Sequence, residues 1–143
     1  MNDNSDKDYL LKSLDNENNS SIGNLNSKLI KSMKNDYLQQ LQLSRDKLKE
    51  YHKKLKDYRY VDDLSNIQYG RYIRWINLTD PNNLKLTTGG IIIDIKICET
   101  GIHLICKNFK NHKFQIRINE FFIFQKITEQ EKIILFALDY LDK

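Results

Sequence analysis

Apolar residues recur with two different periods along the chain, and the change of period divides it into helical and strand-rich parts. From about Ser27 to Tyr58 they follow a helical spacing that neither Gly nor Pro interrupts. Between residues 70 and 127 they alternate with polar residues in short runs separated by turn residues. A helical spacing returns after Thr128. The pattern predicts an α+β fold in which a long helix precedes a set of antiparallel strands and a short helix follows them.

The first helical part, residues 28–59, predicts a basic amphipathic helix with a coiled-coil-like seam. With Leu41 at position a of a heptad, leucines recur at a and tyrosines at d, and Lys34 and Ser44 interrupt the repeat. A helix of about thirty residues extends about 45 Å, so we expect part of its seam to meet another chain. The alternative is a helix that packs only its C-terminal half on the strands. The candidate helix-association residues are Tyr37, Leu41, Leu48, Tyr51, Leu55 and Tyr58.

The strand-rich part predicts a small five-stranded antiparallel barrel, because short strands separated by regular turn signals are typical of such folds. Turn signals occur at residues 80–83 and 99–101. Strict alternation would place the odd-numbered isoleucines of residues 91–97 on one buried face. The predicted strands are residues 70–76, 89–97, 101–106, 113–118 and 122–127.

The C-terminal residues predict a short helix that packs on the barrel. Thr128 and Glu131 have the spacing of a capping box, in which the two side chains satisfy each other's backbone amides. Behind them Ile133, Ile134 and Leu138 recur at helical spacing. We expect this apolar stripe to be part of the core.

Charge is distributed unevenly between the parts. Residues 1–27 carry 2 basic and 5 acidic side chains and few apolar ones, which predicts an acidic, polar tail that is disordered or loosely helical. Residues 28–59 carry 10 basic and 4 acidic side chains, whereas residues 60–143 carry 11 and 10. Within the last range, residues 60–69 are expected to form a joint and residues 70–143 the barrel with its helix. The excess positive charge therefore belongs to the long helix.

Reactive side chains are not arranged for catalysis. His52, His103 and His112 fall on a helix, a strand and a turn, and no phosphate-binding glycine loop or Cys-x-x-Cys pair occurs. We therefore expect no enzymatic activity, no cofactor and no metal. Cys98 and Cys106 lie on neighbouring predicted strands, where two buried free thiols are expected and a disulfide is the alternative. The absence of a long apolar run predicts a soluble, non-secreted protein with no membrane partner.

Binding is the function class that remains. The lead hypothesis is a non-enzymatic interaction or structural module, with the helix for self-association and the barrel for docking to a protein partner. The alternative is a nucleic-acid-binding barrel with a basic helical arm, in which aromatic rings stack on bases and basic groups contact phosphates. Tyr69, Tyr72, Trp75 and Phe109 also supply the residue types of an aromatic cage. The candidate contact residues for either partner are Arg71, Arg74, Lys107, Lys110, Lys113 and Arg117.

The strand-rich part resembles small proteins of nucleocytoplasmic large DNA viruses. The resemblance covers about residues 67–127 and rests on Gly-Arg-Tyr-Ile-Arg-Trp-Ile, on Gly-Gly followed by isoleucines, and on Gly-Ile-His-Leu-Ile-Cys-Lys-Asn. The chain departs from that pattern in a longer hairpin after Asn108 and in Phe114, where a tryptophan is often found. The resemblance implies a Tudor-like barrel that mediates interactions in the virion or the host cytoplasm. It implies no particular site residue.

Overall fold

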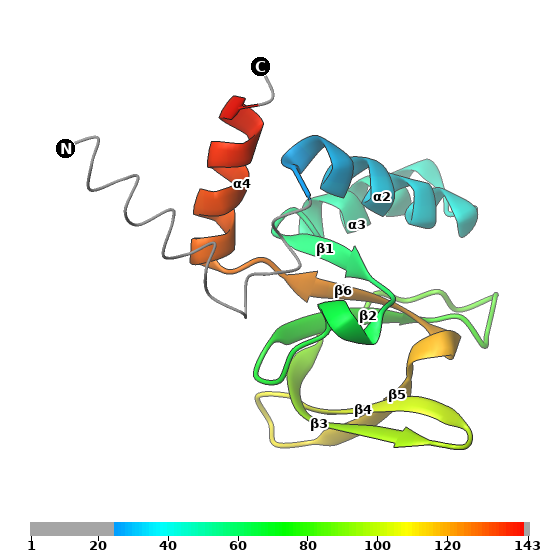
Figure 1. Ribbon diagram of the computed structural model, residues 1–143. Helices are drawn as coiled ribbons and strands as arrows, with labels where there is room; N and C mark the ends of the chain where they lie inside the picture. Colours follow the sequence, from blue (N-terminus) through cyan, green and yellow to red (C-terminus); the bar gives the residue numbers. More distant parts are fainter. Residues whose placement is uncertain (1–24, 142–143) are drawn as a thin grey trace. The chain divides into compact units, whose positions relative to one another are not determined.

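The computed structural model describes residues 25–141 (Figure 1). The tail predicted for residues 1–27 therefore lies almost entirely outside the described residues. The helices are α2 (Ser27–Gln40), α3 (Arg45–Lys54) and α4 (Glu129–Leu141). The strands are β1 (Tyr58–Val61), β2 (Tyr72–Asn77), β3 (Gly90–Cys98), β4 (Gly101–Lys107), β5 (Lys113–Arg117) and β6 (Phe121–Lys126). Two short 3-10 turns, η2 (Leu64–Asn66) and η3 (Ile118–Glu120), complete the described elements.

The chain divides into two compact units. One unit, Met33–Lys126, contains all six strands, α3 and most of α2. Of the residues that the structure describes, the other unit contains residues 25–32 and 127–141, and therefore α4. The boundary falls inside α2 and directly after β6. Each unit has a hydrophobic core of its own.

The predicted single helix over residues 28–59 is wrong, because α2 and α3 are separated by residues 41–44. Gln42 has a left-handed backbone, with φ of 53°. The Ser44 hydroxyl accepts a hydrogen bond from the Lys47 amide at 3.3 Å and caps the N-terminus of α3. A capping serine marks the start of a new helix. Ser44, one of the two residues that interrupt the heptad pattern, therefore marks the start of a second helix. No continuous coiled-coil-like seam runs through residues 28–59.

The predicted five-stranded Tudor-like barrel is also wrong. Six antiparallel strands form one open sheet in the order β1-β6-β2-β3-β4-β5, so β1 and β5 lie at its two edges. The additional strand β1 pairs with β6 from Tyr58 opposite Lys126 to Val61 opposite Ile123. All four residues of β1 are buried. The predicted long helix included the first two residues of this strand, and the predicted joint included the last two.

The inner core is formed by apolar side chains from all six strands, so the open sheet curls around it (Figure 1). Trp75 lies in this core together with Ile73 of the same strand. The inner core consists of Val61, Ile67, Ile73, Trp75, Ile92, Leu104, Cys106, Ile116 and Ile123. Only one face of β3, β4 and β5 contributes to it.

The helix-facing core lies on the opposite side of β1, β6 and β2, where α2 and α3 cover the sheet. The Tyr37 ring on α2 stacks on the Tyr60 ring of β1 with centroids 3.6 Å apart, and Phe122 of β6 meets both edge-on. Its buried members are Leu38, Tyr51, Leu55, Tyr58, Tyr60, Ile76, Leu86 and Phe124. The three strands β1, β6 and β2 are therefore covered on both faces.

A β-bulge in β3 shifts the side-chain alternation. The register slips between Ile92 and Asp94, and a bulge adds one residue that the neighbouring strand does not match. As a result Ile92 points into the inner core, whereas Ile91 and Ile93 are 44% and 41% exposed. The predicted buried face of odd-numbered isoleucines is therefore wrong at Ile91 and Ile93, and also at Ile97, which is 72% exposed.

Helix α4 begins with the predicted capping box. The Thr128 amide donates to Glu131 Oε1 at 3.0 Å, and the Glu131 amide donates to Thr128 Oγ1 at 3.1 Å. The predicted packing of this helix on a barrel is replaced by a small cluster in which Ile134 and Leu135 are buried with Ile30 and Ile127. The Ser27 amide of α2 also donates to Asp139 Oδ1 at 2.9 Å.

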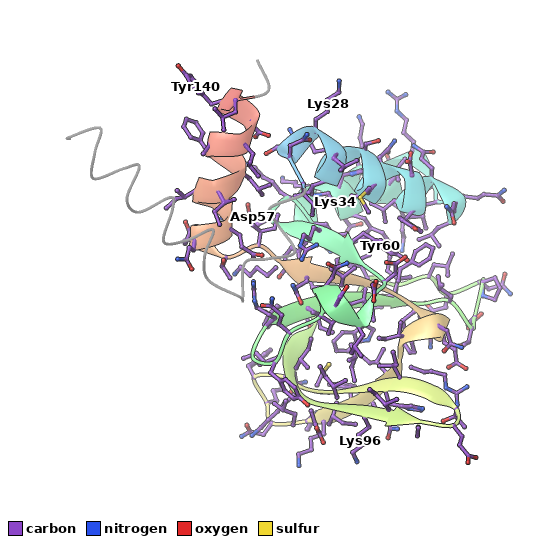
Figure 2. All side chains as sticks on the ribbon, in the orientation of Figure 1. Lys28, Lys34, Asp57, Tyr60, Lys96 and Tyr140 are labelled. Carbon is purple, nitrogen blue, oxygen red and sulfur yellow. The ribbon has the colours of Figure 1, made fainter. Side chains whose placement is uncertain are left out.

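A buried lysine joins α2 to the segment that connects α3 with β1. Lys34 Nζ donates hydrogen bonds to the carbonyl oxygens of Leu55, at 2.7 Å, and Tyr58, at 3.0 Å (Figure 2). Leu55 is the C-terminal cap of α3, and carbonyl groups at that end of a helix have no partner within the helix. The Leu55 carbonyl also accepts a hydrogen bond from the Tyr58 amide at 3.0 Å. The ammonium group therefore adds a charged donor to buried backbone acceptors and holds α2 to both segments.

We expect Lys34→Met to lower the free energy of unfolding by about 2–4 kcal/mol, because buried carbonyl groups lose a charged donor. Lys31→Met is the matched control, since Lys31 is exposed on the same helix, and it should change stability by less than about 0.5 kcal/mol. Urea unfolding of both variants measures the difference. Equal stability of the two variants would contradict the structural role of Lys34.

We also expect Gly89→Ala to destabilise the protein more than Gly70→Ala. Both glycines have a left-handed backbone, with φ of 90° and 78°, so both substitutions carry a conformational cost of about 1–2 kcal/mol. A Cβ atom at Gly89 would in addition lie 2.1 Å from the Ile73 carbonyl oxygen, whereas at Gly70 nothing lies within 4 Å. Thermal unfolding of the two variants measures this steric contribution. Equal decreases in stability would show that β2 shifts to accommodate the methyl group without an energetic cost.

Candidate partner-binding face

The outer face of β3, β4 and β5 is the side of these strands that points away from the inner core. Leu104, Cys106 and Ile116 point inward, so their neighbours along each strand point outward. Three cross-strand rows result from the register: Ile91–Lys107–Lys113, Asp94–Ile105–Gln115 and Lys96–His103–Arg117. Neighbours in such a row lie close enough to form one surface.

Basic side chains dominate this face. The three rows contain one carboxylate, that of Asp94, and four basic side chains, those of Lys96, Lys107, Lys113 and Arg117. Lys96 extends away from the sheet into solvent (Figure 2). Arg117 Nη1 is held 3.0 Å from Glu120 Oε1 in η3, so its guanidinium group is partly neutralised. The outer face therefore keeps a net positive charge although the strand-rich part as a whole is close to neutral.

Isoleucines form an apolar centre within these charges. Ile91 and Ile93 are both more than two-fifths exposed, and Ile105 is half-buried. The bulge brings Ile93 to this side, because two residues of β3 lie opposite a single residue of β4. Two exposed isoleucines next to each other leave apolar surface in contact with water, which a partner could cover.

The centre of the third row is rigid. His103 is buried, and its Nδ1 lies 2.8 Å from Gln115 Nε2, while its Nε2 lies 2.9 Å from Thr100 Oγ1. An amide nitrogen can only donate, so Nδ1 accepts and the proton of the neutral ring is on Nε2. His103 lies on a strand, as the sequence predicted, and it is bonded on both ring nitrogens and shielded from water.

The six candidate contact residues separate into three places. Lys107, Lys113 and Arg117 share the outer face. Lys110 lies in the adjoining hairpin, with Nζ 5.8 Å from the ring centroid of Phe109, which is 82% exposed. The two remaining candidates bond to neighbouring groups on other parts of the sheet.

Arg71 and Arg74 are those two residues. Arg71 Nε donates to Gln68 Oε1 at 3.0 Å and its Nη1 to the Lys126 carbonyl at 3.4 Å. Arg74 Nε donates to the Thr87 carbonyl at 2.8 Å. Sequence patterns did not identify Lys96, Ile91 and Ile93 as members of the outer face. Their neighbours on that face depend on the cross-strand register and on the bulge.

The six helix-association candidates all contribute to the helix-facing core. Tyr51, Leu55 and Tyr58 are buried, and the Tyr51 hydroxyl donates to the Leu84 carbonyl at 2.7 Å. Tyr37, Leu41 and Leu48 are partly buried against the same cluster. These six side chains, from which self-association was predicted, therefore pack on the sheet of the same chain.

The aromatic cage residues do not converge. Trp75 belongs to the inner core and Tyr72 to the helix-facing core, on opposite faces of β2. Phe109 is in the hairpin between β4 and β5. Tyr69 is exposed, and its hydroxyl accepts a hydrogen bond from the Ile95 amide at 3.3 Å. These four rings therefore do not line a common pocket.

The histidines lie on three separate elements. His52 Nε2 on α3 is 3.1 Å from Asn35 Oδ1 on α2, and burial, followed by the nearby Lys34 charge, lowers the pKa of His52. His103 supports the outer face, and His112 is exposed in a hairpin. Within residues 25–141, no group of three or more His, Cys, Asp and Glu side chains is placed to hold a metal ion.

Comparison with protein-family models, curated proteins and solved structures gives no significant match to this chain. Its function is therefore inferred from its own side chains. In the part of the chain that the structure describes, no helix has the length and apolar character needed to cross a membrane. The resemblance to viral proteins stays a prediction.

The two cysteines are free and differ in exposure. The register pairs Cys98 with Gly101 and Cys106 with Ile92, at opposite ends of the β3–β4 hairpin, so the disulfide alternative is wrong. Cys106 is buried as expected, but Cys98 is exposed. Burial raises the pKa of the Cys106 thiol to about 12. Its reactive thiolate form is therefore almost absent near neutral pH.

We expect a thiol reagent such as Ellman's reagent to modify one cysteine of the folded protein at pH 8 and both after unfolding. The reactive residue is Cys98, because the Cys106 thiol is buried and protonated. The Cys98→Ser variant should give no signal until denaturant is added. A signal from the folded variant at the rate of a free thiol would show that the inner core opens readily.

Proposed function

We propose that the chain is a non-enzymatic interaction module that docks an acidic protein partner on the outer face of β3, β4 and β5. The observation that carries this proposal is the register that places Ile91 in a row with Lys107 and Lys113, and the row of Ile105 between that row and the row of Lys96 and Arg117. An apolar centre with a charged rim is typical of protein-binding surfaces. This sheet face is also free of the covering that α2 and α3 give to β1, β6 and β2.

The charge of the rim defines the chemistry of the partner. Positive groups attract an acidic partner and align it during the encounter, and they repel basic proteins. The isoleucines then add affinity when water leaves their surface, so the partner should present apolar side chains among its acidic ones. The rigid support from His103 means that this part of the face needs little reorganisation on binding.

A nucleic acid is the second candidate, and one observation favours it. Phe109 and Lys110 form an exposed aromatic and basic tip directly beside Lys107 and Lys113. Such a pair can stack on an unpaired base and contact its phosphate. The three rows of the outer face contain no aromatic residue, however, and Arg74 is bonded to a backbone carbonyl on another part of the sheet. The protein partner is therefore the proposal that the side chains support best.

The location of the module follows only from the resemblance described above. A viral relative would use such a face in the virion or the host cytoplasm. A docking module is suited to either place, since it carries out no chemistry of its own.

A peptide of alternating acidic and leucine residues should bind the protein, and more tightly than polyglutamate, because only the first peptide covers the isoleucines. Lys107→Glu/Lys113→Glu should weaken binding of that peptide by about tenfold or more, since two attractive charges become repulsive. The matched control is Lys47→Glu/Lys49→Glu, which makes the same charge change on exposed residues of α3. Fluorescence anisotropy measures the affinities, and circular dichroism checks that each variant is folded.

An oligothymidine in the same assay separates the two candidates. Tight binding with a steep dependence on salt, lost in Phe109→Ala, would favour the nucleic acid and overturn the protein partner, because phosphate contacts release counterions. Equal affinities of the two charge-reversal variants for the peptide would overturn the outer face as the docking site. Loss of binding in Ile91→Ser/Ile93→Ser would instead support it.

A further inference from the structure

Helix α4 is apolar on two opposite faces. Its buried face contains Ile134, Leu135 and Leu138, which pack with Ile30 and Ile127. The opposite stripe is formed by Ile133, Phe136, Ala137 and Tyr140, which recur at helical spacing. Phe136 is 75% exposed and Tyr140 is 70% exposed. A helix that is hydrophobic all round is normally buried on all sides.

We propose that this exposed stripe binds the same stripe of a second copy, in an antiparallel pair of α4 helices. Around a two-fold axis between residues 136 and 137, Phe136 of one copy meets the small Ala137 of the other. Ile133 then meets Tyr140. A two-fold contact requires such self-complementarity, because each patch must fit itself. The fit of large against small side chains allows the two helices to approach closely.

The charges beside the stripe favour a second copy over other occupants. Lys132 Nζ lies 3.3 Å from Glu129 Oε1, so the two rim charges of each copy neutralise each other. Two identical rims therefore meet with these two charges compensated within each copy, and antiparallel helix dipoles attract. The third charge near the stripe, Asp139, accepts a hydrogen bond from the Ser27 amide. Within the described residues of α4 the one cation, Lys132, is already paired with Glu129. An acidic occupant, including the chain's own residues 1–24 with their excess of Asp and Glu, would therefore find no free positive charge on this helix.

The dimer is expected to be weak and independent of the outer face. A single helix stripe buries less than the roughly 800 Å² per partner of a standard interface. Dissociation in the micromolar range follows, so both species should be present at ordinary laboratory concentrations. The residues involved belong to α4 alone, whereas the proposed docking residues belong to β3, β4 and β5.

Sedimentation velocity of the full chain over a series of concentrations tests this inference. We expect the sedimentation coefficient to rise from the monomer to the dimer value. Phe136→Ser/Tyr140→Ser should remain a monomer throughout. Phe109→Ser is the matched control, because it removes an equally exposed ring from the β4–β5 hairpin, and it should dimerise like the unmodified chain. Lys107→Glu/Lys113→Glu should also dimerise normally, which separates this result from the docking proposal.

Cysteine crosslinking tests the register. In a Cys98→Ser background, Ala137→Cys should form an intermolecular disulfide on mild oxidation, because residue 137 lies beside the proposed axis. Lys53→Cys, exposed on α3, should not. An unmodified chain that stays monomeric at all concentrations would overturn the proposal. In that case residues 1–24 should be deleted and the binding of an apolar dye compared with that of the full chain. Stronger dye binding after the deletion would show that the N-terminal residues cover the stripe.

Discussion

The buried ammonium group of Lys34 is the contact on which the helix-covered half of the sheet depends. It bonds to the carbonyl of Leu55, the C-terminal cap of α3, and to that of Tyr58, the first residue of β1, so three segments meet at one side chain. The cost of burying a lysine is compensated only when its charge is fully engaged. Once α3 and β1 are joined in this way, α2 is fixed over the sheet, and Tyr37 stacks on Tyr60. The apolar side chains of α2 and α3 then pack against the sheet of the same chain.

This arrangement makes the two halves of the sheet different. Strands β1, β6 and β2 have apolar side chains on both faces, as strands buried on both sides do. Strands β3, β4 and β5 have one buried and one solvated face, which is why their sequences alternate. The side chains of the solvated face are free to vary without loss of the core. The basic and isoleucine side chains found there lie outside both cores, and the proposed docking role is the one that would use them together.

Local sequence patterns predicted those parts of the fold that depend on local rules. The capping box of α4 and the positions of the five strands between residues 70 and 127 follow from spacing alone. Strand β1 was not predicted because Tyr58 continues the heptad spacing of the preceding helix, and its four residues are too few to show a period of their own. The role of Lys34 was equally hidden, since a periodicity argument counts every lysine as polar. The isoleucine centre of the docking face depends on a bulge, which no pattern of period two contains.

The two proposed surfaces belong to different units of the chain, and this separation has a functional consequence. A dimer formed through α4 would carry two copies of the outer face. A partner with two acidic segments would then bind the second face at a high effective concentration, and the overall affinity would exceed that of one face. Weak contacts of each kind would suffice for a stable assembly that still dissociates when either contact is lost. Such a combination of a weak dimer and a modest docking face suits an assembly component better than an enzyme or a high-affinity receptor.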